Sequence, residues 1–165
     1  MTTNEAHREC TTASSTSRGP SVRSRRDGNG EIYIASAALQ GQQRLTNEPW
    51  DDAAPVLSPV GDEVLFVSNR SGTPRLWIMD ADGANQRLFA TGSAGFVPEA
   101  SPAWRPAGDQ VAFTSTRTGT SQVFVVSSAG GTAVQITHEA NGAFTGEISA
   151  AMLLDVRAGQ RIVVF

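Results

Sequence analysis

Three stretches of the chain share one pattern: RDGNGEIYIAS at residues 26–36, RSGTPRLWIMD at 70–80 and RTGTSQVFVVS at 117–127. Each begins with Arg, has Gly two positions later, and then enters an apolar segment that contains a large aromatic residue. Because they begin at residues 26, 70 and 117, the copies lie 44 and 47 residues apart. A period of about 40–50 residues is typical of a repeat architecture.

One complete copy, residues 53–99, has the spacing of a small antiparallel sheet. Its predicted strands lie at 54–57, 64–68, 76–79 and 86–89. Turn residues separate them, as with Pro59 and Gly61, because Pro presets φ for an early turn position and Gly supplies a positive φ. Four antiparallel strands within about 45 residues indicate one β-propeller blade.

The other copies divide the rest of the chain. Their spacing matches, since Pro55 and Pro102 lie 47 residues apart, as do Phe66 and Phe113. The predicted segments are a disordered Ser/Thr/Arg-rich leader at 1–25, a half blade at 26–52, whole blades at 53–99 and 100–147, and a degenerate half blade at 148–165. The sequence therefore predicts an all-β fold, a partial β-propeller of four-stranded antiparallel blades.

Large aromatic residues recur at equivalent strand positions. Tyr33, Trp77 and Phe124 occupy one position of the repeat, and Phe66 and Phe113 occupy another. Each ring buries on the order of 150–250 Å² when it is packed. We therefore expect these side chains to pack between neighbouring blades.

Half, whole, whole and half copies amount to about three blades, whereas closed propellers typically have at least four. Two explanations stay open. The chain is a truncated piece of a longer propeller, or two copies form a homodimer that completes a six-bladed ring through their half blades. The eroded last copy, MLLDVRAGQRIVVF at 152–165, favours truncation.

Composition excludes some function classes. The net charge is −3, which gives no support for binding nucleic acid or a membrane surface. No apolar run reaches the roughly 18 residues of a membrane span. The sequence as written shows no secretory signal, so no export is expected from it. One cysteine, Cys10, cannot form a disulfide within the chain, and the cellular compartment stays open.

Two stretches resemble the TolB-type WD-like β-propeller repeat: PVLSPVGDEVLFVSNRSGTPRLWIMDADGANQRLF from residue 55 and PAWRPAGDQVAFTSTRTGTSQVFVVSSAGG from residue 102. That repeat has Pro-x-Trp-Ser-Pro-Asp-Gly, an apolar run ending in Phe, Ser-x-Arg-x-Gly, an aromatic strand and Asp-x-Asp-Gly. The chain departs from it at Val60 and Ala107, where the repeat usually has Asp, and at Arg105, where it has Ser.

The resemblance implies a scaffold and not a reaction, because one fold hosts many functions. TolB-type propellers are periplasmic interaction platforms, and similar repeats form the non-catalytic propellers of prolyl-oligopeptidase-like enzymes, so relatives are often periplasmic or extracellular. We expect a non-catalytic module that binds a protein or peptide. The alternative is the propeller remnant of such a peptidase, or of a carbohydrate-active enzyme, without its catalytic domain.

No catalytic set is recognisable in the sequence. A serine hydrolase of the oligopeptidase kind needs Gly-x-Ser-x-Gly followed by an acid and a His. The nearest string, Gly92 to Gly95, is one residue too short, and the only histidines are His7 and His138. His138 follows Thr137 as Asn47 follows Thr46, which favours a loop role. We expect that the chain is not an enzyme.

Cofactor and metal motifs are also incomplete. The run from Asp27 to Glu31 imitates the start of a calcium loop, but its twelfth position is Ala38 in place of a bidentate Glu. Two His and one Cys cannot form a zinc site, and without Lys there is no phosphate-binding loop of the Walker type. We expect no cofactor and no metal.

The loops between successive repeats carry the candidate binding residues. Such loops open on one rim of a propeller, and loops on rigid scaffolds often carry binding. The first loop has an aromatic residue among acids, Trp50 with Asp51 and Asp52, and the next such loop contains Phe96. We expect these four residues to form a rim surface for a protein or peptide partner.

Overall fold

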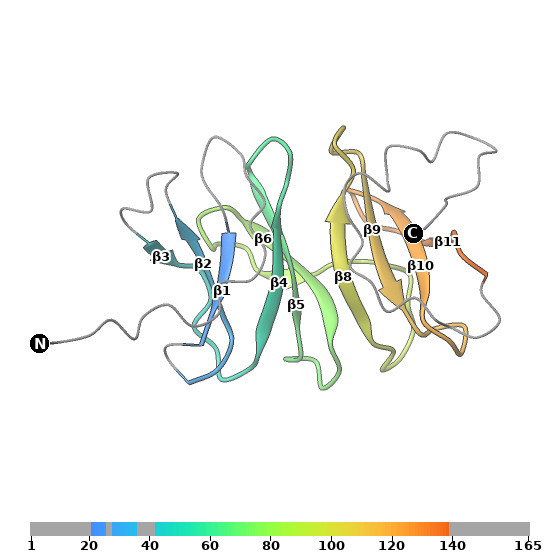
Figure 1. The fold of residues 1–165 in the computed structure, drawn as a ribbon, viewed down its shortest axis with the longest axis horizontal. Coiled ribbons are helices and arrows are strands. Elements are labelled where there is room, and N and C mark those ends of the chain that lie inside the picture. Colours follow the sequence, from blue (N-terminus) through green and yellow to red (C-terminus); the bar gives the residue numbers. More distant parts are fainter. Residues whose placement is uncertain (1–20, 26–27, 36–41, 139–165) are drawn as a thin grey trace, which may run out of the picture.

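A computed structural model of the chain describes residues 21–25, 28–35 and 42–138. The described part consists of three antiparallel sheets that lie side by side in sequence order (Figure 1). The strands are β1 (Ser21–Ser24), β2 (Glu31–Ala35), β3 (Gln42–Arg44), β4 (Asp52–Leu57), β5 (Glu63–Ser68), β6 (Arg75–Asp80), β7 (Arg87–Leu88), β8 (Glu99–Trp104), β9 (Gln110–Ser115), β10 (Gln122–Ser127) and β11 (Val134–Gln135).

The three sheets are successive blades of a partial β-propeller. We name them blade A (β1–β3), blade B (β4–β7) and blade C (β8–β11). The strand orders β4-β5-β6-β7 and β8-β9-β10-β11 follow the chain, as in a meander of neighbouring hairpins. The first described strand of each blade lies beside that of the next, with β4 between β1 and β8, while the short last strands lie farthest out. The predicted all-β propeller fold is confirmed.

Blade A begins earlier than the sequence predicted. β1 pairs with β2 so that Val22 opposes Tyr33, just as Phe66 opposes Trp77 in blade B. β1 is therefore the second strand of its blade, and the prediction of a disordered leader was wrong for residues 21–24. The stretch SVRS carries little strand signal of its own and is held in place by its partner strand. Residues 1–20 and the degenerate half blade at 148–165 lie outside the described residues.

The first strands of blades B and C each contain a bulge. The register shifts between Ala53 and Val56 in β4 and between Ala100 and Ala103 in β8. Both bulges place a residue that is not glycine at positive φ: Ala54 at 48° and its equivalent Ser101 at 49°. A bulge re-aims the end of a strand. Each first strand therefore turns its acidic first residue, Asp52 or Glu99, into the protein.

The hydrophobic core lies between the blades, as expected from the recurring aromatic residues. One cluster joins blades A and B around Ile32, Phe66 and Met79. A second joins blades B and C and contains Leu65, Leu76, Ile78, Phe89, Trp104, Val111, Phe113, Phe124 and Val126. Blade B supplies residues to both clusters, so both faces of its sheet are covered, and its inner strands are nearly continuous apolar runs. No helix of the described residues is long and apolar enough to cross a membrane.

Candidate binding surfaces

Arg70 and Arg117, two of the repeated arginines, each pack inside their own blade. Arg70 lies over the rings of Trp77 and Phe66, with its guanidinium carbon 4.7 and 5.4 Å from their centroids. Arg117 repeats this over Phe124 and Phe113, at 4.6 and 5.1 Å. Stacking on an aromatic face lets a planar guanidinium be partly buried while its N–H groups remain available for hydrogen bonds. The Arg-x-Gly turn is therefore a structural feature of the blade.

The acceptors of these arginines are the buried acids that begin β4 and β8. Arg70 contacts Asp52 Oδ2 at 2.8 Å, and Arg117 contacts Glu99 Oε1 at 2.8 Å. Glu99 also accepts from Arg75 of blade B, with Arg75 Nε 3.1 Å from its Oε2. Burial, the largest effect, lowers the pKa of Arg117, and the charge of Glu99 opposes that shift. Glu99 thus connects blades B and C.

Asp52 has a poorer set of partners than Glu99. Its Oδ2 pairs with Arg70, but its buried Oδ1 has no hydrogen-bond partner. Burial raises the pKa of Asp52 above its ordinary value, in spite of the opposing effects of Ser68 and Arg70. The side chain is fully buried at the start of β4. The prediction that Asp52 belongs to an open binding loop was therefore wrong, because strand pairing with Ser68 draws it inside.

Asp51 has a backbone-anchoring role. Its Oδ1 accepts from Gly30 N at 2.8 Å and from Arg23 Nη2 at 3.3 Å, and its own N–H donates to Asn69 Oδ1 at 3.0 Å. Its side chain is 49% exposed. Asp51 is therefore half-exposed, and its carboxylate ties the loop to blade A.

Trp50 and Phe96 are the exposed members of the predicted rim set. Trp50 is 46% exposed, and its loop is fixed because Asn29 Nδ2 donates to Trp50 O at 2.6 Å. Phe96 is 78% exposed and lies against the turn at Gly72. Both loops run from the last strand of one blade to the first strand of the next. They therefore open on the same rim and present a large ring to solvent.

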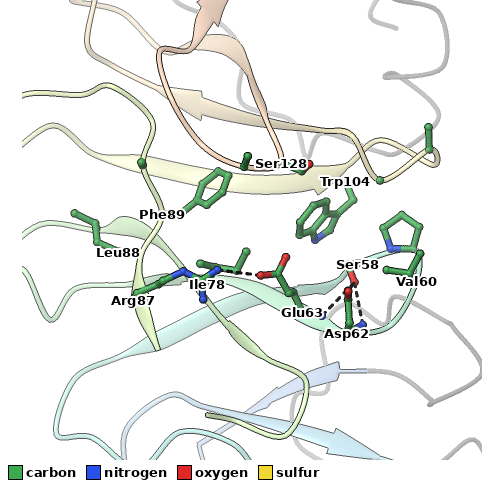
Figure 2. A pocket seen from close by; sticks show the side chains of 15 residues that line it. Ser58, Val60, Asp62, Glu63, Ile78, Arg87, Leu88, Phe89, Trp104 and Ser128 are labelled. Carbon is green, nitrogen blue, oxygen red and sulfur yellow. Dashed lines mark hydrogen bonds and ion pairs between the residues drawn. The ribbon is translucent and has the colours of Figure 1, made fainter. Parts of the chain in front are cut away.

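A groove between blades B and C opens on the opposite rim, which sequence analysis did not single out. Its volume is about 630 Å³. Its residues are Ser58, Pro59, Val60, Asp62, Glu63, Ile78, Arg87, Leu88, Phe89, Ala90, Trp104, Ala107, Gly108, Ser128 and Ala129. Figure 2 shows Phe89 and Trp104 on one side of the space, with Glu63 and Arg87 on the other.

Two turns form one end of this groove, those of residues 58–61 and 105–108. A hydrogen bond from Gly61 N to Ser58 O closes the first, and one from Gly108 N to Arg105 O closes the second. The departures Val60 and Ala107 lie in these turns. The sequence therefore contained a signal for the groove: each of the two turns has an apolar residue where the repeat usually has a polar one.

The acid-containing turn that imitates a calcium loop is engaged within the protein. Glu31 is buried, accepts from Arg44 Nη2 at 2.8 Å and from Thr46 Oγ1 at 2.5 Å, and also accepts from Asn29. Within residues 21–25, 28–35 and 42–138, no group of three His, Cys, Asp or Glu side chains could hold a metal ion. Asp27 and Ala38 lie outside the described residues. The described surfaces therefore offer apolar contact and hydrogen bonding.

Comparison with known proteins agrees with the repeat and the sheet topology. The structure has the fold of TolB β-propellers. It superposes on TolB from Acinetobacter baumannii with a TM-score of 0.65 at 22% identity, covering 79% of this chain and 32% of that one. For a putative TolB from Agrobacterium tumefaciens the TM-score is 0.62 at 23% identity, with 73% and 42% covered. The chain thus spans less than half the length of either protein.

Peptidase propellers provide the second match. Puromycin hydrolase superposes with a TM-score of 0.55 at 18% identity, covering 67% of this chain and 19% of that one. The model of the dipeptidyl peptidase IV (DPP IV) N-terminal region matches residues 43–156, more than half of the chain. The chain belongs to this family of β-propeller domains.

Proposed function

We propose that this chain is a non-catalytic β-propeller segment that binds a protein or peptide at the rim carrying Trp50 and Phe96. The supporting observation is the exposure of these two rings, 46% and 78%, on loops of one rim. Tryptophan is among the residues most enriched at the energetic centres of interfaces. The loops are also braced by hydrogen bonds, such as Arg75 Nη1 to Gly95 O at 3.0 Å, which lowers the ordering cost of binding.

The test uses a phage-displayed library of random dodecapeptides, selected on the full chain. Enriched clones are then measured against Trp50→Ala and Phe96→Ala. Since 1.4 kcal/mol corresponds to tenfold in affinity, and an interface hot spot costs at least about 2 kcal/mol, we expect each substitution to weaken binding by about 25-fold or more.

Val134→Ala is the matched control, because Val134 is 64% exposed but belongs to β11 and not to a rim loop. It should leave the binding of enriched clones unchanged. Clones that bind the two rim variants as well as the parent chain would contradict the rim assignment. A selection that enriches no clone would contradict the binding role itself.

The family match and the likeness to puromycin hydrolase favour a second candidate, the propeller portion of a peptidase. In that case the partner of the rim is a hydrolase domain. Sequencing of the adjoining reading frames distinguishes the two. A Gly-x-Ser-x-Gly elbow followed by an acid and a His in the downstream frame supports the peptidase.

A further inference from the structure

The groove between blades B and C exposes apolar side chains that a solvated rim would not need. Val60 is 79% exposed in its turn and Leu88 is 44% exposed in β7. The two residues lie at opposite ends of the view in Figure 2, Leu88 on the sheet face that it shares with Trp77, and the nearly buried Phe89 and Trp104 lie between them. The volume of about 630 Å³ falls within the usual range of ligand sites, roughly 300–1,000 Å³.

A free strand edge borders the same groove. β7 is the last strand of blade B, and no described strand pairs with its outer edge at Arg87 and Leu88. Just beyond β7, Gly131 N of blade C donates to Ala90 O at 2.9 Å, so the open part of the edge ends there. Phe89 N donates to Leu76 O at 2.9 Å, which makes Phe89 and Leu76 a hydrogen-bonded pair. Since such pairs alternate along an antiparallel ladder, Leu88, opposite Trp77, directs its N–H and C=O away from β6. An extended peptide could pair there.

The groove is lined by more negative than positive side chains. Its charged residues are Asp62, Glu63 and Arg87. Arg87 Nη2 pairs with Glu63 Oε1 at 3.0 Å. Asp62 is exposed and accepts from Ser58 Oγ at 2.6 Å, but no cation among the described residues pairs with it. One negative charge is therefore left for a ligand to neutralise, next to the apolar turn at Val60.

The geometry points to a second binding site in this groove, for an extended peptide that carries bulky apolar side chains and one basic residue. The peptide adds to the edge of β7 through main-chain hydrogen bonds at Leu88, as in β-augmentation. Its apolar side chains pack against Val60 and cover the small exposed parts of Trp104 and Phe89, which are 6% and 4% exposed. Its basic side chain pairs with Asp62. This site lies on the rim opposite Trp50 and Phe96 and is independent of the rim function proposed above.

The probes are fluorescein-labelled octapeptides that alternate threonine and leucine, with arginine, glutamine or glutamate at one central position. Their binding to the full chain is followed by fluorescence anisotropy. One exposed ion pair contributes about 0.2–1 kcal/mol, so the arginine peptide should bind up to about fivefold more tightly than the glutamine peptide. The glutamate peptide should bind more weakly than either.

Variants locate the site. Val60→Asp restores the residue usual in this turn, so the fold is kept, and it should weaken the uncharged glutamine peptide at least fivefold by removing apolar contact. Leu88→Glu should weaken it further. Val134→Glu places the same charge on β11, the equivalent outer strand of blade C, and should have no effect. Methylating the peptide amides along one edge should abolish binding, whereas methylating the other edge should not.

Equal binding of the arginine and glutamate peptides, or full binding by Val60→Asp and Leu88→Glu, would overturn the proposal. A Leu88 amide that exchanges slowly in the absence of peptide would also overturn it, because the edge would then be filled by the chain itself or by a second copy. A dimer in sedimentation velocity that Val60→Asp dissociates would identify that second copy. None of these results bears on the variants of Trp50 and Phe96.

Discussion

Single charged residues in this protein have very different roles although the sequence presents them alike. Asp51 and Asp52 are neighbours in the chain, yet one is half-exposed and the other is fully buried. Asp52 has one carboxylate oxygen paired with Arg70 and the other without a partner. A buried carboxylate with incomplete hydrogen bonding is better tolerated when protonated. Asp52 therefore couples the stability of the protein to pH.

The direction of this coupling is fixed by the raised pKa of Asp52. Because the folded state holds the proton more tightly than the unfolded state, its stability falls as pH rises from about 3.8 through the folded pKa. Asp52→Asn removes this loss. We expect the difference in free energy of unfolding, variant minus parent, to increase with pH across that window.

Urea unfolding at a series of pH values measures the effect, and Asp109→Asn is the control for losing one aspartate charge at an exposed position. The side chain of Asp109 is 55% exposed and pairs with Arg105. A difference between Asp52→Asn and the parent that stays constant or decreases with rising pH would contradict the assignment.

The first strand of each whole blade stores local strain. Ala54 and Ser101 occupy the left-handed region within β4 and β8, at φ of 48° and 49°. A side chain in that region costs roughly 1–2 kcal/mol, whereas glycine enters it freely. The strain recurs at the equivalent position of two blades and is therefore a regular feature of the first strand. The bulge directs the acidic residue at the start of that strand into the blade junction.

Replacing Ala54 by glycine should relieve this strain. We expect Ala54→Gly to raise the free energy of unfolding by about 0.5–1 kcal/mol, because the relief exceeds the entropy that glycine gains in the unfolded chain. Ala107→Gly provides the comparison, since Ala107 is an exposed turn residue outside the set of residues at positive φ. It should lower stability by about 0.4–1 kcal/mol. Thermal or urea unfolding measures both variants. Changes in the free energy of unfolding that have the same sign for Ala54→Gly and Ala107→Gly would refute this account.

The described molecule is a row of blades, each in contact with its neighbours, so its cohesion depends on the junctions. The junction of B and C has an apolar cluster and an ionic centre at Glu99, which receives Arg75 and Arg117. A hydrogen bond from Trp104 Nε1 to Val56 O at 3.2 Å also crosses it. In such quasi-one-dimensional arrays, stability is approximately the sum of unit and junction contributions.

Glu99→Gln tests how much the ionic centre contributes to the free energy of unfolding. It leaves two largely buried guanidinium groups without a negative partner, and breaking a buried pair from one side costs about 3–5 kcal/mol. Glu63→Gln is the matched change in an exposed pair and should cost under about 1 kcal/mol. Urea unfolding gives both values, and limited proteolysis should show cleavage between blades B and C in Glu99→Gln first. Similar losses in the two variants would be inconsistent with this role.

Local sequence patterns are enough to predict the blade and its repetition. Turn residues and short apolar runs act locally, so the four strands of blade B lie within two residues of their predicted bounds. The recurring aromatic residues also predicted the interblade core. The exposed rings of Trp50 and Phe96 follow from the same logic, because the loops that carry them are placed by the repeat.

Which polar residues are buried, and where the groove lies, depends on contacts that form only in the folded protein. Asp52 is buried through pairing with Ser68 and Arg70, which lie far along the chain. β1 exists because β2 offers it a partner, not because SVRS favours a strand. The groove needs the turn at Val60 and blade C to meet. These features depend on contacts between segments distant in sequence, and local patterns do not encode such contacts.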